Sequence, residues 1–148
     1  MIYWDTSAIV PLYTEEATST FWENQLLDAT DTPASSALAI TEFSYALHHK
    51  VLRKNLDSSA VDGITSLFTQ DHEAGRWRLV PLGSDVIAAS LQVAKEVAQK
   101  SPPVVLRSLD GLHLGAALTL KCDTIATGDQ RLATAAKHIG LKTIFPHT

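Results

Sequence analysis

The sequence predicts an α/β protein, a single three-layer α/β/α domain with a mostly parallel central sheet. The chain has 148 residues, which is the length of about one domain. Hydrophobic residues make up 45% of it and charged residues 19%, a composition that can form a core. Short apolar runs alternate with stretches of helical spacing, a pattern typical of parallel strands covered by helices on both faces.

The first part of the chain is expected to form two strands and two helices. The apolar run Ile2–Trp4 is typical of a short buried strand. Apolar residues at helical spacing predict helices over Thr18–Leu27 and Leu38–Leu52, of which the second is strongly amphipathic. Between them, Pro33–Ser36 is expected to be a strand, although its residues are small.

The middle of the chain is expected to alternate in the same way. Asp57 offers a cap for a helix that carries apolar residues over Val61–Phe68. Trp77–Leu82 is predicted to be a strand. Ser84 is then expected to cap a helix over Asp85–Gln99.

The last part of the chain begins with a helix over Leu109–Lys121, for which Ser108 is the expected cap. Three elements should follow: a strand at Thr124–Thr127, a helix at Gln130–His138 and a strand at Lys142–Phe145. Gly140 suits the left-handed position that commonly ends a helix.

Four acidic residues are expected at one edge of this sheet. Asp5 ends the first strand, and Asp129 follows the strand Thr124–Thr127. Asp110 lies in the first turn of a nearly apolar helix, and Glu42 lies about one turn into the helix after the second strand. Ligands of open parallel sheets bind beyond the carboxyl ends of the strands, so these acids are candidate ligand-binding residues.

Each acid also has a purely structural explanation. Helix capping would account for Asp5 and for Asp129 singly. The helix dipole would account for Asp110, and an exposed helix face would account for Glu42. Capping does not explain Glu42, so a common ligand-binding site remains the alternative explanation for the four acids.

Carboxylates that meet at one point repel each other, and they stay ionised together only if cations lie between them. A cluster of oxygen ligands suits Mg²⁺ or Mn²⁺ rather than Zn²⁺. Such a site is well suited to phosphodiester hydrolysis, because one metal ion lowers the pKa of a water and a second stabilises the leaving oxygen. Attack by water should leave a 5′-phosphate and a 3′-hydroxyl.

Other polar residues are candidates for supporting roles. Thr6 and Thr127 either hold the acids in place through their hydroxyls or simply cap helices. His113 lies one turn after Asp110, and we expect it to pack or form hydrogen bonds rather than act as a general base. Arg131, just past Asp129, is a candidate for phosphate contact.

A basic patch ends the helix Leu38–Leu52. It consists of His48, His49, Lys50, Arg53 and Lys54. A solvated helix end is the simpler interpretation of this patch. Because His49 and Arg53 follow roughly the same helix face as Glu42, they could instead line a path for RNA.

Four segments of the sequence resemble the PIN domain, and most closely the small VapC-type ribonuclease toxins. They are MIYWDTSA (residues 1–8), SALAITEF (36–43), LDGLHLGAA (109–117) and TGDQRL (127–132), in the family's order. The resemblance implies a PIN-like nuclease domain over residues 1–148, in which Asp5, Glu42, Asp110 and Asp129 bind Mg²⁺ or Mn²⁺. It also implies an endoribonuclease that forms a homodimer with two-fold symmetry and is held in check by a VapB-like antitoxin.

Charge and sequence order exclude several other classes of protein. With 12 Lys and Arg against 16 Asp and Glu, the net charge of −4 argues against a protein that coats duplexes. A receiver-like domain would need an acid pair after the first strand, whereas Asp5 is followed here by Thr6 and Ser7. A phosphatase would need a second Asp where Ser7 stands. A nuclease acting on DNA and a domain that only binds its partner remain open alternatives.

The same sequence predicts an intracellular protein with no membrane association. No run of about 18 apolar residues is present, and the N-terminus lacks the basic start of a signal peptide. The single cysteine, Cys122, allows no internal disulfide. We therefore expect a cytoplasmic protein.

Overall fold

Parallel strands form the central sheet of the computed structural model, which describes residues 1–147. They are β1 (Ile2–Trp4), β2 (Ala34–Ser36), β3 (Arg78–Val80), β4 (Thr124–Ala126) and β5 (Lys142–Ile144). The order in the sheet is β3-β2-β1-β4-β5, and every described pair is parallel. β1 is thus central, with Tyr3 in register with Ala34 on one side and Ile125 on the other.

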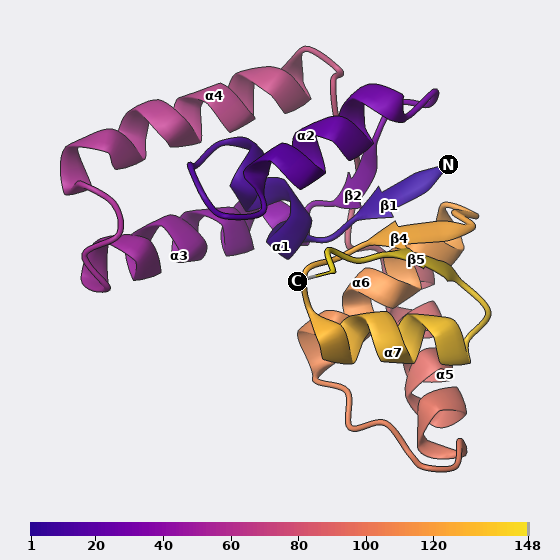
Figure 1. The fold of residues 1–148 in the computed structure, drawn as a ribbon. Helices are drawn as coiled ribbons and strands as arrows, with labels where there is room; N and C mark the ends of the chain where they lie inside the picture. The colour runs from indigo at the N-terminus through magenta and orange to yellow at the C-terminus, as the bar shows by residue number, and fades with distance from the viewer. Residues whose placement is uncertain (148) are drawn as a thin grey trace.

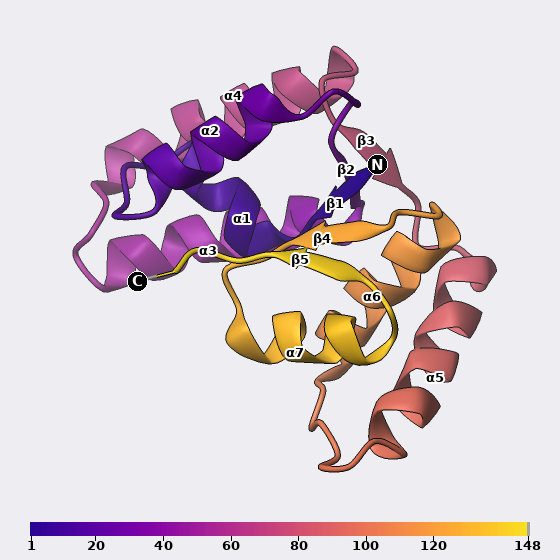
Figure 2. The same ribbon diagram turned by 45° about the vertical axis from the view of Figure 1, so that its right-hand side comes forward.

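Helices cover both faces of this sheet. They are α1 (Thr6–Ile9), α2 (Ser19–Asp28), α3 (Leu38–Leu52), α4 (Val61–Glu73), α5 (Ser84–Ala98), α6 (Ser108–Thr119) and α7 (Gln130–His138), with 3-10 turns at Val10–Leu12 and Ser58–Ala60. Helices α5, α6 and α7 lie together on the side of the sheet opposite α2 and α4 (Figures 1 and 2). The predicted three-layer α/β/α fold is confirmed.

The two faces of the sheet build two cores, because successive strand residues point to opposite faces. Tyr3 packs with apolar residues of α5, α6 and α7, among them Leu114. The next residue, Trp4, packs in the other core, edge-to-face against Trp22 and Trp77. Both Trp22 and Trp77 are buried.

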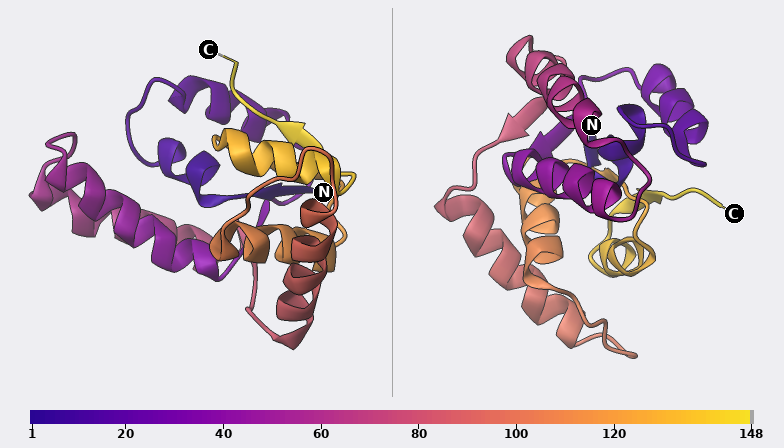
Figure 3. Two further views of the ribbon diagram at one scale, coloured as in Figure 1. Left: turned by 90° about the horizontal axis from the view of Figure 1, so that it is seen from below. Right: turned by 90° about the vertical axis from the view of Figure 1, so that its left-hand side faces the viewer.

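Helix α3 extends away from the carboxyl edge of the sheet. It begins two residues after β2 and runs for 15 residues beside α4. The pair α3 and α4 projects well beyond the strands (Figures 1 and 3). A helix in this position carries side chains outward from the strand ends.

Several boundaries differ from those expected. Ser84 and Ser108 do not cap helices: Gly83 and Arg107 take the extended cap conformation, and each serine is already the first helical residue. The strand expected over Trp77–Leu82 is only Arg78–Val80, because this edge strand pairs with the three residues of β2 alone.

Within the described part of the chain, none of the helices combines the length and hydrophobicity of a membrane-spanning segment.

Candidate active site

The four acids lie at the carboxyl edge of the sheet, close enough for their charges to affect one another's pKa values. Asp5 directly follows β1 and caps α1, while Asp129 lies just beyond β4 and caps α7. Glu42 projects from the second turn of α3, and Asp110 lies in the first turn of α6. The charge of Glu42 raises the pKa of both Asp5 and Asp110, so these residues share one local field.

Asp5 is a buried carboxylate held by three donors. The Ser7 hydroxyl donates to its Oδ1 at 2.6 Å, the Ala8 backbone N–H donates at 3.3 Å, and the Thr127 hydroxyl donates to Oδ2 at 3.1 Å. Burial raises the pKa of Asp5 to about 6, although the charge of His113 and two of these hydrogen bonds act in the opposite direction. The charged form of Asp5 is therefore costly.

Glu42 is anchored by a buried histidine. His113 Nε2 forms a hydrogen bond with Glu42 Oε1, while His113 Nδ1 is 2.7 Å from the Tyr3 hydroxyl. The Thr6 hydroxyl also donates to Glu42 Oε1, at 2.7 Å. His113 is only 2% exposed, so both of its ring nitrogens are committed inside the protein.

The Glu42–His113 contact has the character of an ion pair. Burial of the ring opposes a positive charge, but the hydrogen bond to Glu42 and the nearby carboxylates outweigh it and raise the pKa of His113. Burial likewise opposes the charge on Glu42, yet the hydrogen bond and charge of His113 lower the pKa of this carboxyl. The two groups stabilise each other's charged forms.

Asp110 carries the unsatisfied group of the site. Its Oδ2 is buried and has no hydrogen-bond partner among the described residues. The exposed Arg107 forms a long ion pair with it, with Nε 3.9 Å from Oδ2. Burial and the charge of Asp129 raise the pKa of Asp110. A buried carboxylate oxygen without a donor is costly, and a bound cation would remove that cost.

Asp129 is held as a helix cap. Its Oδ1 accepts hydrogen bonds from the backbone N–H groups of Arg131 at 2.8 Å and Leu132 at 3.2 Å. Its own N–H donates to the Thr127 hydroxyl at 3.0 Å. Thr127 thus links Asp129 to Asp5.

The expected supporting residues fall into two groups. Thr6 and Thr127 contact the carboxylates of Glu42 and Asp5, which is where hydroxyls that hold those acids should lie. Arg131 and Arg53 are exposed and make no ion pair with any described residue. The functional roles of all four residues stay predictions.

Two contacts at the site are not apparent from the sequence. Ser7 donates to Asp5 and also accepts from the Gly128 N–H at 2.8 Å, which joins the two loops that carry Asp5 and Asp129. Tyr3 binds His113 across 110 residues of sequence. Adjacency to Asp5 is a usable signal for Ser7, but no local pattern marks Tyr3.

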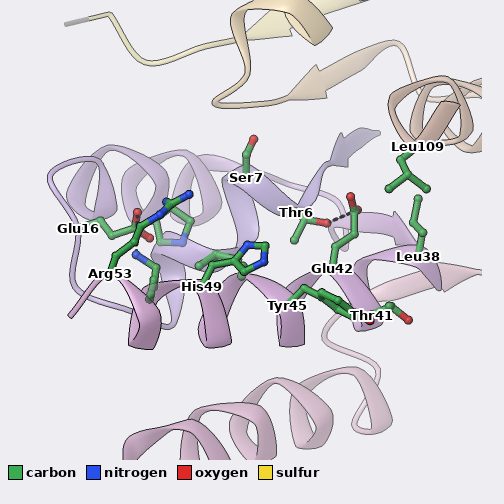
Figure 4. A pocket seen from close by; sticks show the side chains of 14 residues that line it. Thr6, Ser7, Glu16, Leu38, Thr41, Glu42, Tyr45, His49, Arg53 and Leu109 are labelled. Carbon is green, nitrogen blue, oxygen red and sulfur yellow. Dashed lines mark hydrogen bonds and ion pairs between the residues drawn. The ribbon is translucent and has the colours of Figure 1, made fainter. Parts of the chain in front are cut away.

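A cavity of about 700 Å³ opens beside this edge, along α3. Thr6, Ser7 and Glu42 line its end at the sheet, and Arg53 lines it at the far end of α3 (Figure 4). Of the four acids, Glu42 lines this cavity, so one edge of the acid site lies at the end of a groove large enough for an extended ligand.

The donor set fits a hard divalent cation in its chemistry, since it consists of four carboxylates. The unpartnered Asp110 Oδ2 fits this reading as well. Among residues 1–147, however, no three His, Cys, Asp or Glu side chains are arranged to hold one ion. Glu42 forms a hydrogen bond with His113, and Asp129 accepts one from the backbone of α7. The four carboxylates are therefore near one another but do not point at one common position.

Comparison with known proteins identifies relatives of this arrangement. The sequence model of a family described as the PIN domain matches residues 2–138. No curated protein sequence matches the chain.

Three solved structures share its fold. The structure of FitAB bound to an IR36 DNA fragment has a TM-score of 0.69 and 20% identity, and the match covers 100% of this chain and 97% of that one. VapBC2 from Rickettsia felis, bound to a promoter DNA fragment, has a TM-score of 0.68 and 17% identity, covering 99% and 100%. VapC20 from Mycobacterium tuberculosis, described as a Sarcin-Ricin loop cleaving toxin, has a TM-score of 0.68 and 12% identity, covering 91% and 95%.

Proposed function

The chain belongs to the PIN domain family, and from this premise we propose that it is a metal-dependent endoribonuclease that hydrolyses RNA phosphodiester bonds. The observation that carries the proposal is the buried, unpartnered Oδ2 of Asp110 among other carboxylates. Burial and the like charges of Asp129 and Glu42 raise the pKa of Asp110, although the charges of Arg107 and His113 act in the opposite direction, so negative charge is left uncompensated at this carboxylate. A bound divalent cation would compensate it.

Asp5, Glu42, Asp110 and Asp129 would hold Mg²⁺ or Mn²⁺. When bound, such an ion lowers the pKa of a water and stabilises negative charge on the phosphate. Thr127 fixes the orientation of Asp5 through its hydrogen bond, and Thr6 does the same for Glu42. These contacts reduce the rearrangement that the carboxylates need.

The residues near the site favour water as the nucleophile. His113 is buried and bonded at both ring nitrogens, so it is not free to accept a proton from substrate. Cys122 is buried in the core beneath α5 to α7. Attack by water leaves a 5′-phosphate and a 3′-hydroxyl on the products.

We further propose that the protein is the toxin of a type II toxin–antitoxin pair and acts in the cytoplasm. Two of the similar solved structures are described as VapBC and FitAB assemblies, which supports a VapB-like antitoxin as partner. A pull-down with the product of a short neighbouring gene that encodes a DNA-binding fold tests this. Failure of every such neighbour to bind would contradict the toxin–antitoxin assignment.

We also propose a homodimer with two-fold symmetry. Exposed apolar side chains on α5 and on the loop after it, including Leu91 at 64% and Val105 at 77%, give a surface that a second copy could cover. Light scattering at micromolar concentration should give about twice the chain mass of 16.0 kDa. A mass near that of one chain would contradict the dimer.

RNA cleavage tests the nuclease function. Labelled single-stranded RNA is incubated with the protein in Mg²⁺, in Mn²⁺ or in EDTA, beside the same sequence as DNA. Cleavage of RNA is expected with either metal ion and not with EDTA. Asp110→Asn should be inactive but folded, while Asp28→Asn, which removes an exposed carboxylate at the end of α2, should cleave normally. Full activity in EDTA, or cyclic-phosphate product ends, would overturn the proposal.

A further inference from the structure

We propose that the groove along α3 is the path of a single RNA strand, with Tyr45 as a stacking platform for a base and Arg53 as a phosphate contact. This inference rests on the proposed function, since it names how that substrate is held outside the acid site. The groove has a volume of about 700 Å³ and begins at Thr6 and Glu42.

The side chains along the groove follow the geometry of one helix. Tyr45 and His49 are four residues apart on α3, and Arg53 follows four residues later as the residue that ends the helix, so the three lie near one face. Figure 4 shows them in this order along α3, between Glu42 at the sheet and the far end of the helix. At a rise of 1.5 Å per residue, Glu42 and Arg53 are about 16 Å apart along the axis, which is room for a few nucleotides.

Tyr45 presents an exposed aromatic face next to the acid site. Its side chain is 64% exposed, and the His49 ring packs edge-to-face against it with ring centroids 6.3 Å apart. The two rings therefore contact each other on the exposed side of α3. Aromatic faces held in this way stack with bases of single-stranded nucleic acids, whatever the base.

The charge of the groove is positive at its outer end, in a chain whose net charge is −4. Lys50 is paired with Glu16 at 3.2 Å, so part of the basic character is already neutralised within the fold. Arg53 is exposed, lines the groove and has no ion-pair partner among residues 1–147. A guanidinium in this position suits a phosphate group, which it can bind with two parallel hydrogen bonds.

These features favour one strand over a duplex or a peptide. A duplex is bound through many phosphate contacts, and this groove offers an aromatic face and few cations. An acidic peptide would satisfy Arg53 but has no base to stack on Tyr45. An RNA strand satisfies both Tyr45 and Arg53 and places a phosphodiester bond at the acid site.

Fluorescence anisotropy with a short unstructured labelled RNA, in EDTA, tests the path without requiring cleavage. Tyr45→Ala should weaken binding by about five- to a hundredfold, whereas Tyr45→Phe should bind as wild type, because stacking needs only the ring. Arg53→Ala should weaken binding and lower the slope of log affinity against log salt by about 0.7. Lys95→Ala, which removes an exposed cation on α5, is the matched control and should bind as wild type.

The outcomes separate this inference from the proposed function. Unchanged RNA affinity in both Tyr45→Ala and Arg53→Ala would overturn the RNA path, even if wild type cleaves RNA, and would leave a protein segment as the occupant of the groove. Selective loss of binding in these variants would support the path, even if no metal ion induces cleavage. All three substituted residues are exposed, so thermal melting should show unchanged folding in the four variants.

Discussion

Replacing Asp5 by Asn should stabilise the metal-free protein at neutral pH. Burial raises the pKa of Asp5 from 3.8 to about 6 in the folded protein. The folded protein therefore retains this proton at pH values where the unfolded chain has released it, and its free energy of unfolding falls as pH rises from about 4 to about 6. At 1.36 kcal/mol for each pKa unit, the loss amounts to about 3 kcal/mol above pH 6.

The Asn side chain carries no such cost, but it fits its neighbours less well. It can still accept from Ser7 and Ala8, whereas its NH₂ group must rearrange the contact with Thr127, at a cost of about 1 kcal/mol. The expected net gain is about 2 kcal/mol near pH 7.5, which is a rise in melting temperature of roughly 4–8 °C for a chain of this size.

Urea denaturation in EDTA at about pH 7.5 and about pH 4 measures this difference. Asp5→Asn should be more stable than wild type at the higher pH, and the advantage should disappear at the lower pH, where the folded protein keeps Asp5 protonated and the unfolded chain is itself partly protonated. Asp28→Asn, at an exposed position, should change stability by less than about 0.5 kcal/mol. Equal stability of Asp5→Asn and wild type at about pH 7.5, or an advantage that persists unchanged at pH 4, would refute the reasoning.

Two further substitutions test the packing and the site. Gly115→Ala should destabilise the protein by about 1–3 kcal/mol in urea denaturation, because its Cβ would lie 2.7 Å from the backbone oxygen of Val86 on α5. Gly63→Ala on α4 is the matched control. Its Cβ meets nothing within 4 Å, so this substitution should stabilise the protein by about 0.5–1 kcal/mol. A Gly115→Ala protein as stable as this control would contradict the close approach of α5 and α6. His113→Ala should lower RNA cleavage modestly and reduce stability, because the ring anchors Glu42 and fills a buried site. A folded but inactive His113→Ala protein would show that the imidazole takes part in the reaction directly.

Much of the fold could be predicted from local sequence patterns. The helices Leu38–Leu52 and Gln130–His138 have the predicted bounds, and Gly140 has the left-handed φ of 88° expected after a helix end. These segments combine clear periodicity with a clear end signal. By contrast, a helix after Asp5 was expected only through the capping alternative, without bounds for α1 or the turn after it, because Pro11 and the β-branched Ile9 and Val10 obscure any helical pattern in so short a segment.

The same limit applies to the candidate site. The sequence predicts that Asp5 and Asp129 lie at strand ends, because a strand that runs into an acid is visible locally. It does not predict that His113 would link Glu42 to Tyr3, since this chain of hydrogen bonds depends on how α6 packs against β1 and α3. Nor does it predict that Asp110 would have an unpartnered oxygen, which is a property of the three-dimensional packing alone.

The position of bound Mn²⁺ in a crystal shows whether the four acids at the carboxyl edge of the sheet form a metal site. Anomalous scattering from a crystal soaked in Mn²⁺ locates the ion independently of any activity. We expect a peak among the carboxylates of Asp5, Glu42, Asp110 and Asp129, with oxygen ligands at roughly 2.0–2.2 Å and Asp110 Oδ2 among them. No peak at this edge in a crystal that binds Mn²⁺ elsewhere, or a peak that Asp110 does not contact, would contradict this expectation.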